Sequence, residues 1–153
     1  MRKTLSLAAV AALTSAVFAH GDGSHAAQDD RYTESKYRHQ LMEVVGYSAK
    51  NIVMHMKGEV DLDGQMLGHA RILDQAAAMA KDAFAKDTRH KQGKTDSKDA
   101  VWENWEDFSS RLDSFKSDTA ALVSALESEE GVPAATKAMF KNCKSCHDEY
   151  RKD

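Results

Sequence analysis

The two cysteines of the chain lie in a short run near its C-terminus, Cys143-Lys144-Ser145-Cys146-His147. A Cys-x-x-Cys-His run is the attachment signature of c-type haem. Each thiol can form a thioether with one vinyl group of the porphyrin, and the histidine that follows is the usual axial ligand of the iron. The run therefore predicts one covalently attached haem c, anchored by Cys143 and Cys146, with His147 as an iron ligand.

Three other functions of two closely spaced cysteines fit less well. A dithiol redox pair belongs on a βαβ scaffold, and the sequence shows little strand pattern. A structural zinc site needs four ligands, and no second pair of cysteines or histidines stands at ligand spacing. A disulfide between cysteines three residues apart closes a very short loop, and the stabilisation by a disulfide grows with loop length.

The first 19 residues have the features of a cleavable signal peptide. Arg2 and Lys3 supply a positive start, and residues 5–18 form an apolar stretch that is too short to span a bilayer. We expect cleavage near Ala19, export to the periplasm and no membrane anchor. Covalent haem attachment in bacteria takes place outside the cytoplasm, so the two signals agree.

Residues 20–32 read as a flexible polar leader between the signal and the folded domain. A later cut after Ala26 or Ala27 would shorten it. His20 would be the new N-terminus after cleavage at Ala19, and together with His25 it could bind copper. A solvated leader without a metal is the simpler expectation.

The composition favours one all-helical domain. The chain has a single proline among 153 residues, and it is rich in the good helix formers Ala, Lys, Glu, Met and Leu. Removal of Arg2 and Lys3 with the signal changes the formal charge from −3 to −5, which disfavours nucleic acid as a partner. The remaining length suits one domain with one core.

Four amphipathic stretches predict an all-α fold, an antiparallel up-down-up-down four-helix bundle over residues 33–153. Apolar residues recur in them three and four positions apart, as expected for helices with one buried face. We expect side-chain caps at the start of the first and third helices and glycines after their ends. The stretches are residues 33–57, 63–85, 97–129 and 133–151; the expected caps are Thr33 and one of Thr95, Asp96 and Ser97; the glycines are Gly58 and Gly131.

Bundle geometry predicts what faces the iron opposite His147. In an antiparallel bundle, the start of the first helix and the end of the fourth lie at the same end. Met42 is about nine residues into its helix, or roughly 13 Å, and His147 is about five residues from the end of its own, or roughly 7 Å. These heights allow one haem to lie between them. Met42 is therefore expected over the distal face, with His147 and Met42 as the metal ligands.

Two other residues stay open as the distal ligand. Met79 on the second helix lies at a suitable height, and His39, one turn before Met42, would give bis-histidine ligation. Three further methionines are placed at the opposite end of the bundle or on the helix of His147: Met54, Met56 and Met139.

The behaviour of Met42 separates two functions. If its sulfur bonds the iron, the haem is six-coordinate and low-spin, with a raised reduction potential, and suits electron transfer. If the sulfur only packs against the ring, the iron is five-coordinate, and a small gas such as NO or CO can enter an apolar pocket. We expect no enzyme, because no acid–base pair stands beside the distal position and His39 is the only nearby candidate.

The chain resembles the cytochrome c′ family, including its low-spin relatives, over nearly all of the predicted mature protein. The resemblance is most specific in residues 143–151, in Arg38-His39-Gln40-Leu41-Met42, and in residues 97–102 together with Phe108. It implies a four-helix bundle in the bacterial periplasm, often as a homodimer through the first two helices.

The resemblance also implies roles for single residues. Cys143 and Cys146 form the thioethers, His147 is the axial ligand, and Met42 falls on the distal position. Arg38 matches an arginine that contacts a haem propionate, which suits a cation beside a carboxylate. Arg151 matches a basic residue beside the proximal histidine and, four residues after it, lies on the same helix face.

The expected function is therefore that of a carrier of single electrons with a His/Met-ligated haem. Residues 43–46 and 57–59 resemble the low-spin members more, which favours this reading over the binding of NO or CO. A redox partner protein would meet the haem edge near the fourth helix, where three lysines gather: Lys141, Lys144 and Lys152.

Overall fold

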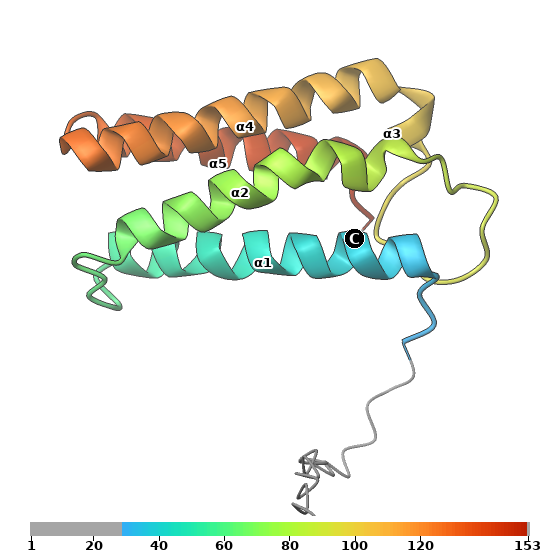
Figure 1. Cartoon of the computed structure of the whole chain (residues 1–153), viewed down its shortest axis with the longest axis horizontal. Coiled ribbons are helices and arrows are strands. Elements are labelled where there is room, and N and C mark those ends of the chain that lie inside the picture. Colours follow the sequence, from blue (N-terminus) through green and yellow to red (C-terminus); the bar gives the residue numbers. More distant parts are fainter. Residues whose placement is uncertain (1–28, 153) are drawn as a thin grey trace, which may run out of the picture.

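The computed structural model describes residues 29–152, so the predicted signal peptide and most of the leader, with His20 and His25, lie outside the described residues. The helices are α1 (Thr33–Met56), α2 (Met66–Ala85), α3 (Ala100–Glu103), α4 (Trp105–Ser128) and α5 (Val132–Tyr150). The four long ones form an antiparallel up-down-up-down bundle (Figure 1), which confirms the predicted fold class. None of the helices in the described part is long and apolar enough to cross a membrane.

The predicted third helix is two helices, α3 and α4, with a break at Asn104, whose φ of −116° and ψ of 44° are not helical. The aromatic contacts explain the break. Trp102 on α3 donates its indole N–H to the carbonyl of Phe84 at 2.9 Å, and the ring of Phe108 on α4 lies 5.2 Å from the ring of Phe84. Residues six apart on one unbroken helix point about 120° apart. The break lets both side chains contact the same residue of α2.

The expected helix caps are partly wrong. Gly58 follows the end of α1 with φ 72°, as predicted, but α4 ends on Glu129 in the left-handed region with φ 59°. Gly131 instead precedes α5 as its N-cap residue. Thr33 is the first residue of α1 and makes no side-chain cap, and the predicted caps of the third helix lie in the loop before α3.

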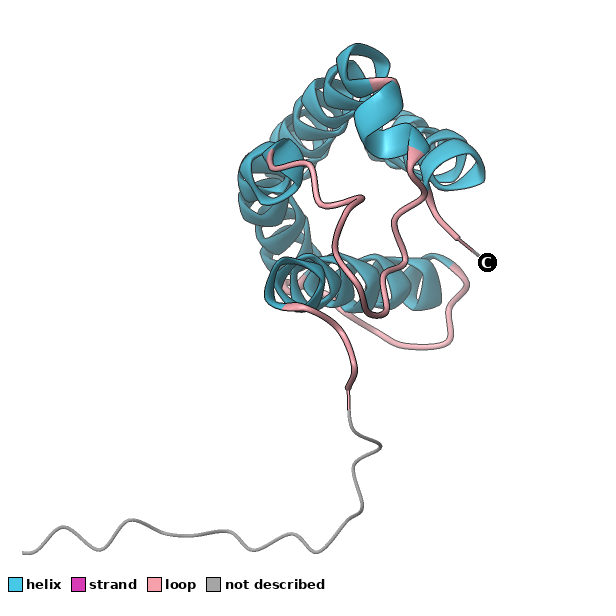
Figure 2. Ribbon diagram, turned by 90° about the vertical axis from the view of Figure 1, so that its right-hand side faces the viewer, coloured by secondary structure: helices cyan, strands magenta, loops and turns pink. Residues whose placement is uncertain are grey.

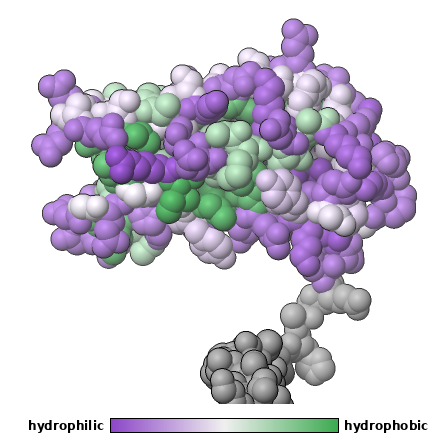
Figure 3. Space-filling view, in the orientation of Figure 1, coloured by the Kyte–Doolittle hydropathy of each residue, from purple (hydrophilic) through white to green (hydrophobic). Residues whose placement is uncertain are grey.

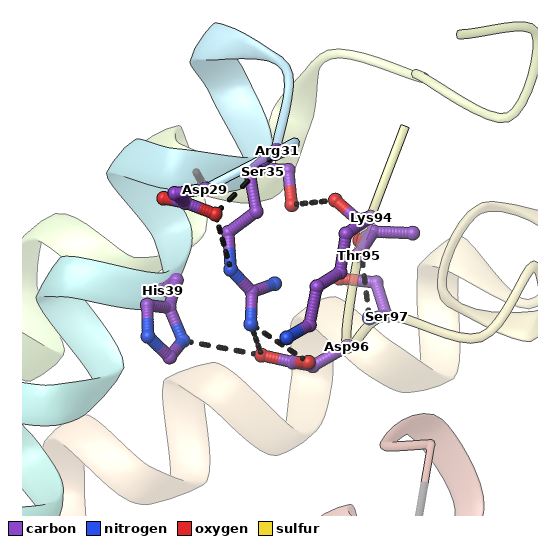
Figure 4. A network of polar contacts seen from close by, with 8 residues as sticks. All are labelled: Asp29, Arg31, Ser35, His39, Lys94, Thr95, Asp96 and Ser97. Carbon is purple, nitrogen blue, oxygen red and sulfur yellow. Dashed lines mark hydrogen bonds and ion pairs between the residues drawn. The ribbon is translucent and has the colours of Figure 1, made fainter. Parts of the chain in front are cut away.

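The loop of residues 86–99 crosses one end of the bundle, between α2 and α3 (Figure 2). It holds the start of α1 through a polar network (Figure 4). Nη2 of Arg31 lies 3.0 Å from Oδ2 of Asp96, and the Ser35 hydroxyl donates to the Lys94 carbonyl at 2.7 Å. The Asp96 carbonyl accepts the N–H of Lys152, beyond the end of α5, at 2.8 Å.

The folded unit begins before Thr33, because the last residues of the predicted leader belong to this network. The Arg31 side chain is only 5% exposed, and the Tyr32 hydroxyl lies 3.0 Å from Oγ1 of Thr88. This end of the bundle therefore joins the start of α1, the 86–99 loop and the C-terminal residues.

The core has two halves along the bundle axis. The half near the α1–α2 and α4–α5 connections is aliphatic and includes the fully buried Ile52, Leu73, Leu122 and Met139. The half near the 86–99 loop is aromatic: the Phe108 ring lies 5.2 Å from Phe84 and 5.0 Å from Tyr150.

The four sides of the bundle are packed unequally. α1 packs on α2, α2 on α4, and α4 on α5, whereas α1 and α5 approach each other closely at very few points. The two helices that carry the predicted ligands, Met42 on α1 and His147 on α5, are therefore not among the pairs that pack extensively on each other.

Candidate haem site

The two thiols face the core from α5. Cys143 and Cys146 are three residues apart, so they share one helix face. Cys143 packs against the aliphatic half of the core and Cys146 against the aromatic half. Both are partly buried, and the α5 motif therefore lies where the two halves meet.

The chemistry of these thiols argues against the alternatives to haem attachment. Burial, with a smaller effect of Cys146, raises the pKa of Cys143 to about 11, and burial also raises the pKa of Cys146. Dithiol redox pairs have a lowered thiol pKa. Within residues 29–152, no group of three or more His, Cys, Asp or Glu side chains is arranged to hold a metal ion.

His147 lies one turn after Cys143 on α5 and is exposed. It lines a depression of about 170 Å³ together with Asp148, Arg151 and Lys152. Partial burial and then the nearby Arg151 guanidinium lower the pKa of His147. Both effects favour the neutral imidazole, the form in which histidine binds a metal.

Met42 approaches the same region from α1. It is partly buried and packs against the aromatic half of the core, the cluster that also receives Cys146. Met42 on α1, the predicted distal residue, and Cys146 on α5, a predicted haem anchor, thus pack on the same apolar cluster. Their two helices make little direct contact with each other.

The other candidates for the distal ligand lie elsewhere. Met79, the alternative distal ligand on the second helix, is 45% exposed on the outside of α2 and so does not face the core. Nδ1 of His39 is 3.2 Å from Oδ2 of Asp96 in the polar network of Figure 4, so His39 is directed toward the loop. Met54 and Met56 are exposed, and Met139 is fully buried in the aliphatic half.

Arg38 is a buried cation one turn before Met42, with only 3% exposure. Its Nη2 donates to the Tyr32 hydroxyl at 2.9 Å and to Oγ1 of Thr88 at 3.1 Å. Its guanidinium also lies over the rings of Tyr32, Phe84 and Trp102. Contacts from α2, α3 and the 86–99 loop therefore hold this α1 side chain in one position.

Comparison with known proteins decides the family. A family model described as Cytochrome C' matches residues 33–151, which is most of the chain. The chain belongs to the cytochrome c′ family. It is therefore a haem protein and not an enzyme, as the sequence predicted, and the family implies covalent haem c, in agreement with Cys143, Cys146 and His147.

Individual relatives agree with this assignment. The cytochrome c′ of Rhodospirillum rubrum is 31% identical, and the alignment covers 100% of both chains. The solved cytochrome c prime of Shewanella frigidimarina is similar in fold, with a TM-score of 0.72, 24% identity, and coverage of 78% of this chain and 94% of that one. A nitric oxide complex of a mutant cytochrome c prime from Alcaligenes xylosoxidans has a TM-score of 0.67, 23% identity, and the same coverage.

The buried charge of Arg38 fits the haem of a cytochrome c′. Its Nε and Nη1 are buried, and no group among the described residues accepts a hydrogen bond from either atom. A buried cation with unused donors is costly unless an anion pairs with it. A haem propionate is such an anion, and bound haem would supply this carboxylate together with an iron centre open to ligands or electrons.

Sequence reasoning missed the residues that hold Arg38. Trp102 stood in a run that matched the family but had no role assigned to it. Tyr32 belonged to the supposed leader, and Thr88 lies in a charged loop with no pattern that marks it. The one sequence feature that could have indicated this contact is the aromatic residue Trp102 shortly after the charged 86–99 loop, and it is a weak signal.

Proposed function

We propose that this cytochrome c′ binds NO or CO in the bacterial periplasm, on one haem c attached to Cys143 and Cys146 with His147 as the only protein ligand of the iron. In this proposal Met42 packs over the distal face without bonding the metal. Arg38 holds a propionate, and Arg151 lies beside the proximal histidine.

The apolar surroundings of Met42 carry this proposal. Met42 and Cys146 pack on the same aromatic cluster, and the imidazole of His39, one turn before Met42 on α1, is directed toward Asp96. Such surroundings accept a small neutral molecule and supply no acid or base for turnover. The nitric oxide complex of the Alcaligenes xylosoxidans mutant supports the choice of ligand, since NO binds that protein.

A second candidate is electron transfer through a haem with both His147 and Met42 as ligands. The observation that favours it is the position of a thioether on α1 above the cluster that receives Cys146. The lysines of the proposed partner surface are exposed, and Lys144 forms an ion pair with Asp148 at 2.6 Å.

The absorption spectrum of the purified holoprotein distinguishes the two candidates. We expect a high-spin spectrum in both oxidation states, binding of NO and CO by the ferrous form, and faster CO binding in Met42→Ala by roughly tenfold, which corresponds to a barrier lower by about 1.4 kcal/mol. Met79→Ala, the exposed methionine of α2, is the control and should leave the rate unchanged.

The opposite spectrum would support electron transfer. A low-spin form with a methionine-to-iron charge-transfer band toward the red, lost in Met42→Ala and kept in Met79→Ala, would rule out the five-coordinate iron. The intact mass of the exported protein tests the cleavage site and the haem attachment. The mass should correspond to a chain that begins at His20 and carries one covalent haem.

We also propose that the protein is a homodimer through α1 and α2. Figure 3 shows hydrophobic residues gathered along the middle of the face that these helices form. The large apolar side chains that the structure leaves exposed on the two helices include Tyr37 (49%), Val44 (46%), Tyr47 (60%), Ile72 (43%) and Met79 (45%). A second copy of the chain, related by a twofold axis, would cover this face.

A further inference from the structure

A second group of side chains able to bind a metal lies at the end of the bundle opposite the aromatic half. His55 and Met56 are the last residues of α1, and Met66 is the first residue of α2. All three line one pocket of about 350 Å³, at the left end of the bundle in Figure 1. The pocket is completed by residues of α4 and α5: Leu126, Val132, Pro133 and Thr136.

The donor atoms of this pocket are one imidazole and two thioethers. Thioether sulfur is a soft, neutral ligand that favours Cu(I), whereas Mg²⁺, Ca²⁺ and Mn²⁺ prefer carboxylate and carbonyl oxygen. No carboxylate stands among the residues that line the pocket, and the rest of the lining is mostly apolar. We propose that this pocket binds one Cu(I) ion through Nε2 of His55 and the sulfur atoms of Met56 and Met66.

The backbone of the α1–α2 loop holds the imidazole in a suitable way. Nδ1 of His55 lies 3.3 Å from the Val60 carbonyl oxygen and 3.2 Å from the Leu62 nitrogen. The Leu62 N–H donates to Nδ1 when the ring hydrogen is on Nε2. In the other tautomer Nδ1 donates to the Val60 carbonyl and the Leu62 bond is lost, and the lone pair of Nε2 is free for the metal. A metal-binding histidine usually donates its other N–H to such a partner, which orients the ring.

The two methionines differ in how far they take part in core packing. Met56 is 57% exposed, so the ion has a path from solvent, and Met66 is partly buried at the edge of the aliphatic half. The loop between the ligands contains Gly58 and Gly64, with φ of 72° and 75°. These residues let the short loop bring the end of α1 beside the start of α2.

Equilibrium dialysis of the holoprotein tests the proposal. The haem is kept reduced under anaerobic conditions, Cu(I) is buffered by a competing chelator, and copper and iron are both counted by elemental analysis. We expect one copper per haem iron. Met56→Leu and Met66→Leu, which keep the volume nearly constant, should each weaken Cu(I) binding by roughly tenfold or more.

Met54→Leu is the matched control, because Met54 is an exposed methionine beside His55 that does not line the pocket, and it should bind as the unmodified protein does. Three results would overturn the proposal. The protein could bind no Cu(I), all variants could bind it equally well, or replacement of His20 and His25 could abolish the binding. Because Met56 is exposed, Met56→Leu should leave the fold intact, and it therefore tests Cu(I) binding even if Met66→Leu alters folding.

Discussion

The guanidinium carbon of Arg38 lies 5.2 Å from the centre of the Trp102 ring, and this contact joins α1 to α3. The rings of Phe84 and Tyr32 lie 5.4 and 5.7 Å from the same carbon. Cation–π contacts of a desolvated guanidinium are worth about 2 kcal/mol or more. The charge is thus held in place, and its Nε and Nη1 are buried with no acceptor among the described residues.

Replacement of Arg38 by Met should lower the reduction potential of the haem. A positive charge near the iron favours the reduced form, and each lost kcal/mol corresponds to roughly 40 mV for a one-electron couple. A redox titration measures the shift. Lys50→Met is the control, since it removes one positive charge from the exposed side of α1. Equal shifts in the two variants would show that Arg38 has no special position relative to the haem.

Replacement of Gly93 by Ala should destabilise the protein by about 1–3 kcal/mol. The φ of Gly93 is 119°, and an added Cβ would lie 2.6 Å from the backbone oxygen of Asp30, in the segment that the 86–99 loop holds. Chemical denaturation of the holoprotein measures the change. Gly68→Ala on α2 meets no atom within 4 Å, so it should instead stabilise by about 0.5–1 kcal/mol. An unchanged free energy of unfolding in Gly93→Ala would contradict the close approach of residue 93 to the Asp30 oxygen.

The ion pair of Asp96 should make the protein less stable in acid. Burial opposes ionisation of this carboxylate, but the hydrogen bond and charge of Arg31, and then those of His39, outweigh it and lower the pKa. The stabilisation is therefore present above about pH 4, the ordinary range of Asp, and disappears as the pH falls through the lowered pKa. The carboxylate is 46% exposed, so the effect is about 1 kcal/mol or less.

Asp96→Asn tests this account through unfolding at several pH values. The variant should be less stable than the unmodified protein at pH 7 and nearly equal to it near pH 2. Asp82→Asn is the control, because Asp82 is exposed on α2 and forms no ion pair among the described residues. If Asp96→Asn lowers the free energy of unfolding by the same amount at all pH values, Asp96 acts through hydrogen bonds and its charge has no effect on stability.

Replacement of Val44 by Asp should separate the proposed dimer into monomers. Val44 is 46% exposed on α1 and belongs to the proposed interface, and burial of an unpaired carboxylate there is unfavourable. Sedimentation equilibrium should show the dissociation constant raised by roughly tenfold or more. Ala121→Asp places the same charge on an exposed position of α4 and should leave the dimer intact. Dissociation by both variants would place the interface elsewhere.

The parts of the fold that were predicted correctly depend on residues close together in the sequence. Apolar residues three and four positions apart located the four long helices, because one buried face requires this spacing. The rise per residue placed Met42 and His147 near the same end of the bundle, and Met42 packs on the cluster that receives Cys146. Both arguments need only local geometry and the direction of each helix.

The predictions that failed involve partners far apart in the sequence. Asp96 was one of three residues expected as a helix cap, but its carboxylate pairs with Arg31, 65 residues away. Arg31 and Tyr32 were placed in a flexible leader because their own sequence is polar. The helix break at Asn104 serves two contacts with Phe84, which no local pattern indicates.

The sequence by itself indicated the haem-attachment motif and determined the class of fold, because Cys143, Cys146 and His147 form one local motif and helix periodicity is also local. Only the tertiary structure decided the environment of these residues. Arg38 became a buried cation with unused donors because Thr88, Phe84 and Trp102 reach it from other elements. His55, Met56 and Met66 share one pocket because α1 and α2 pack side by side and the loop between them brings the end of one beside the start of the other.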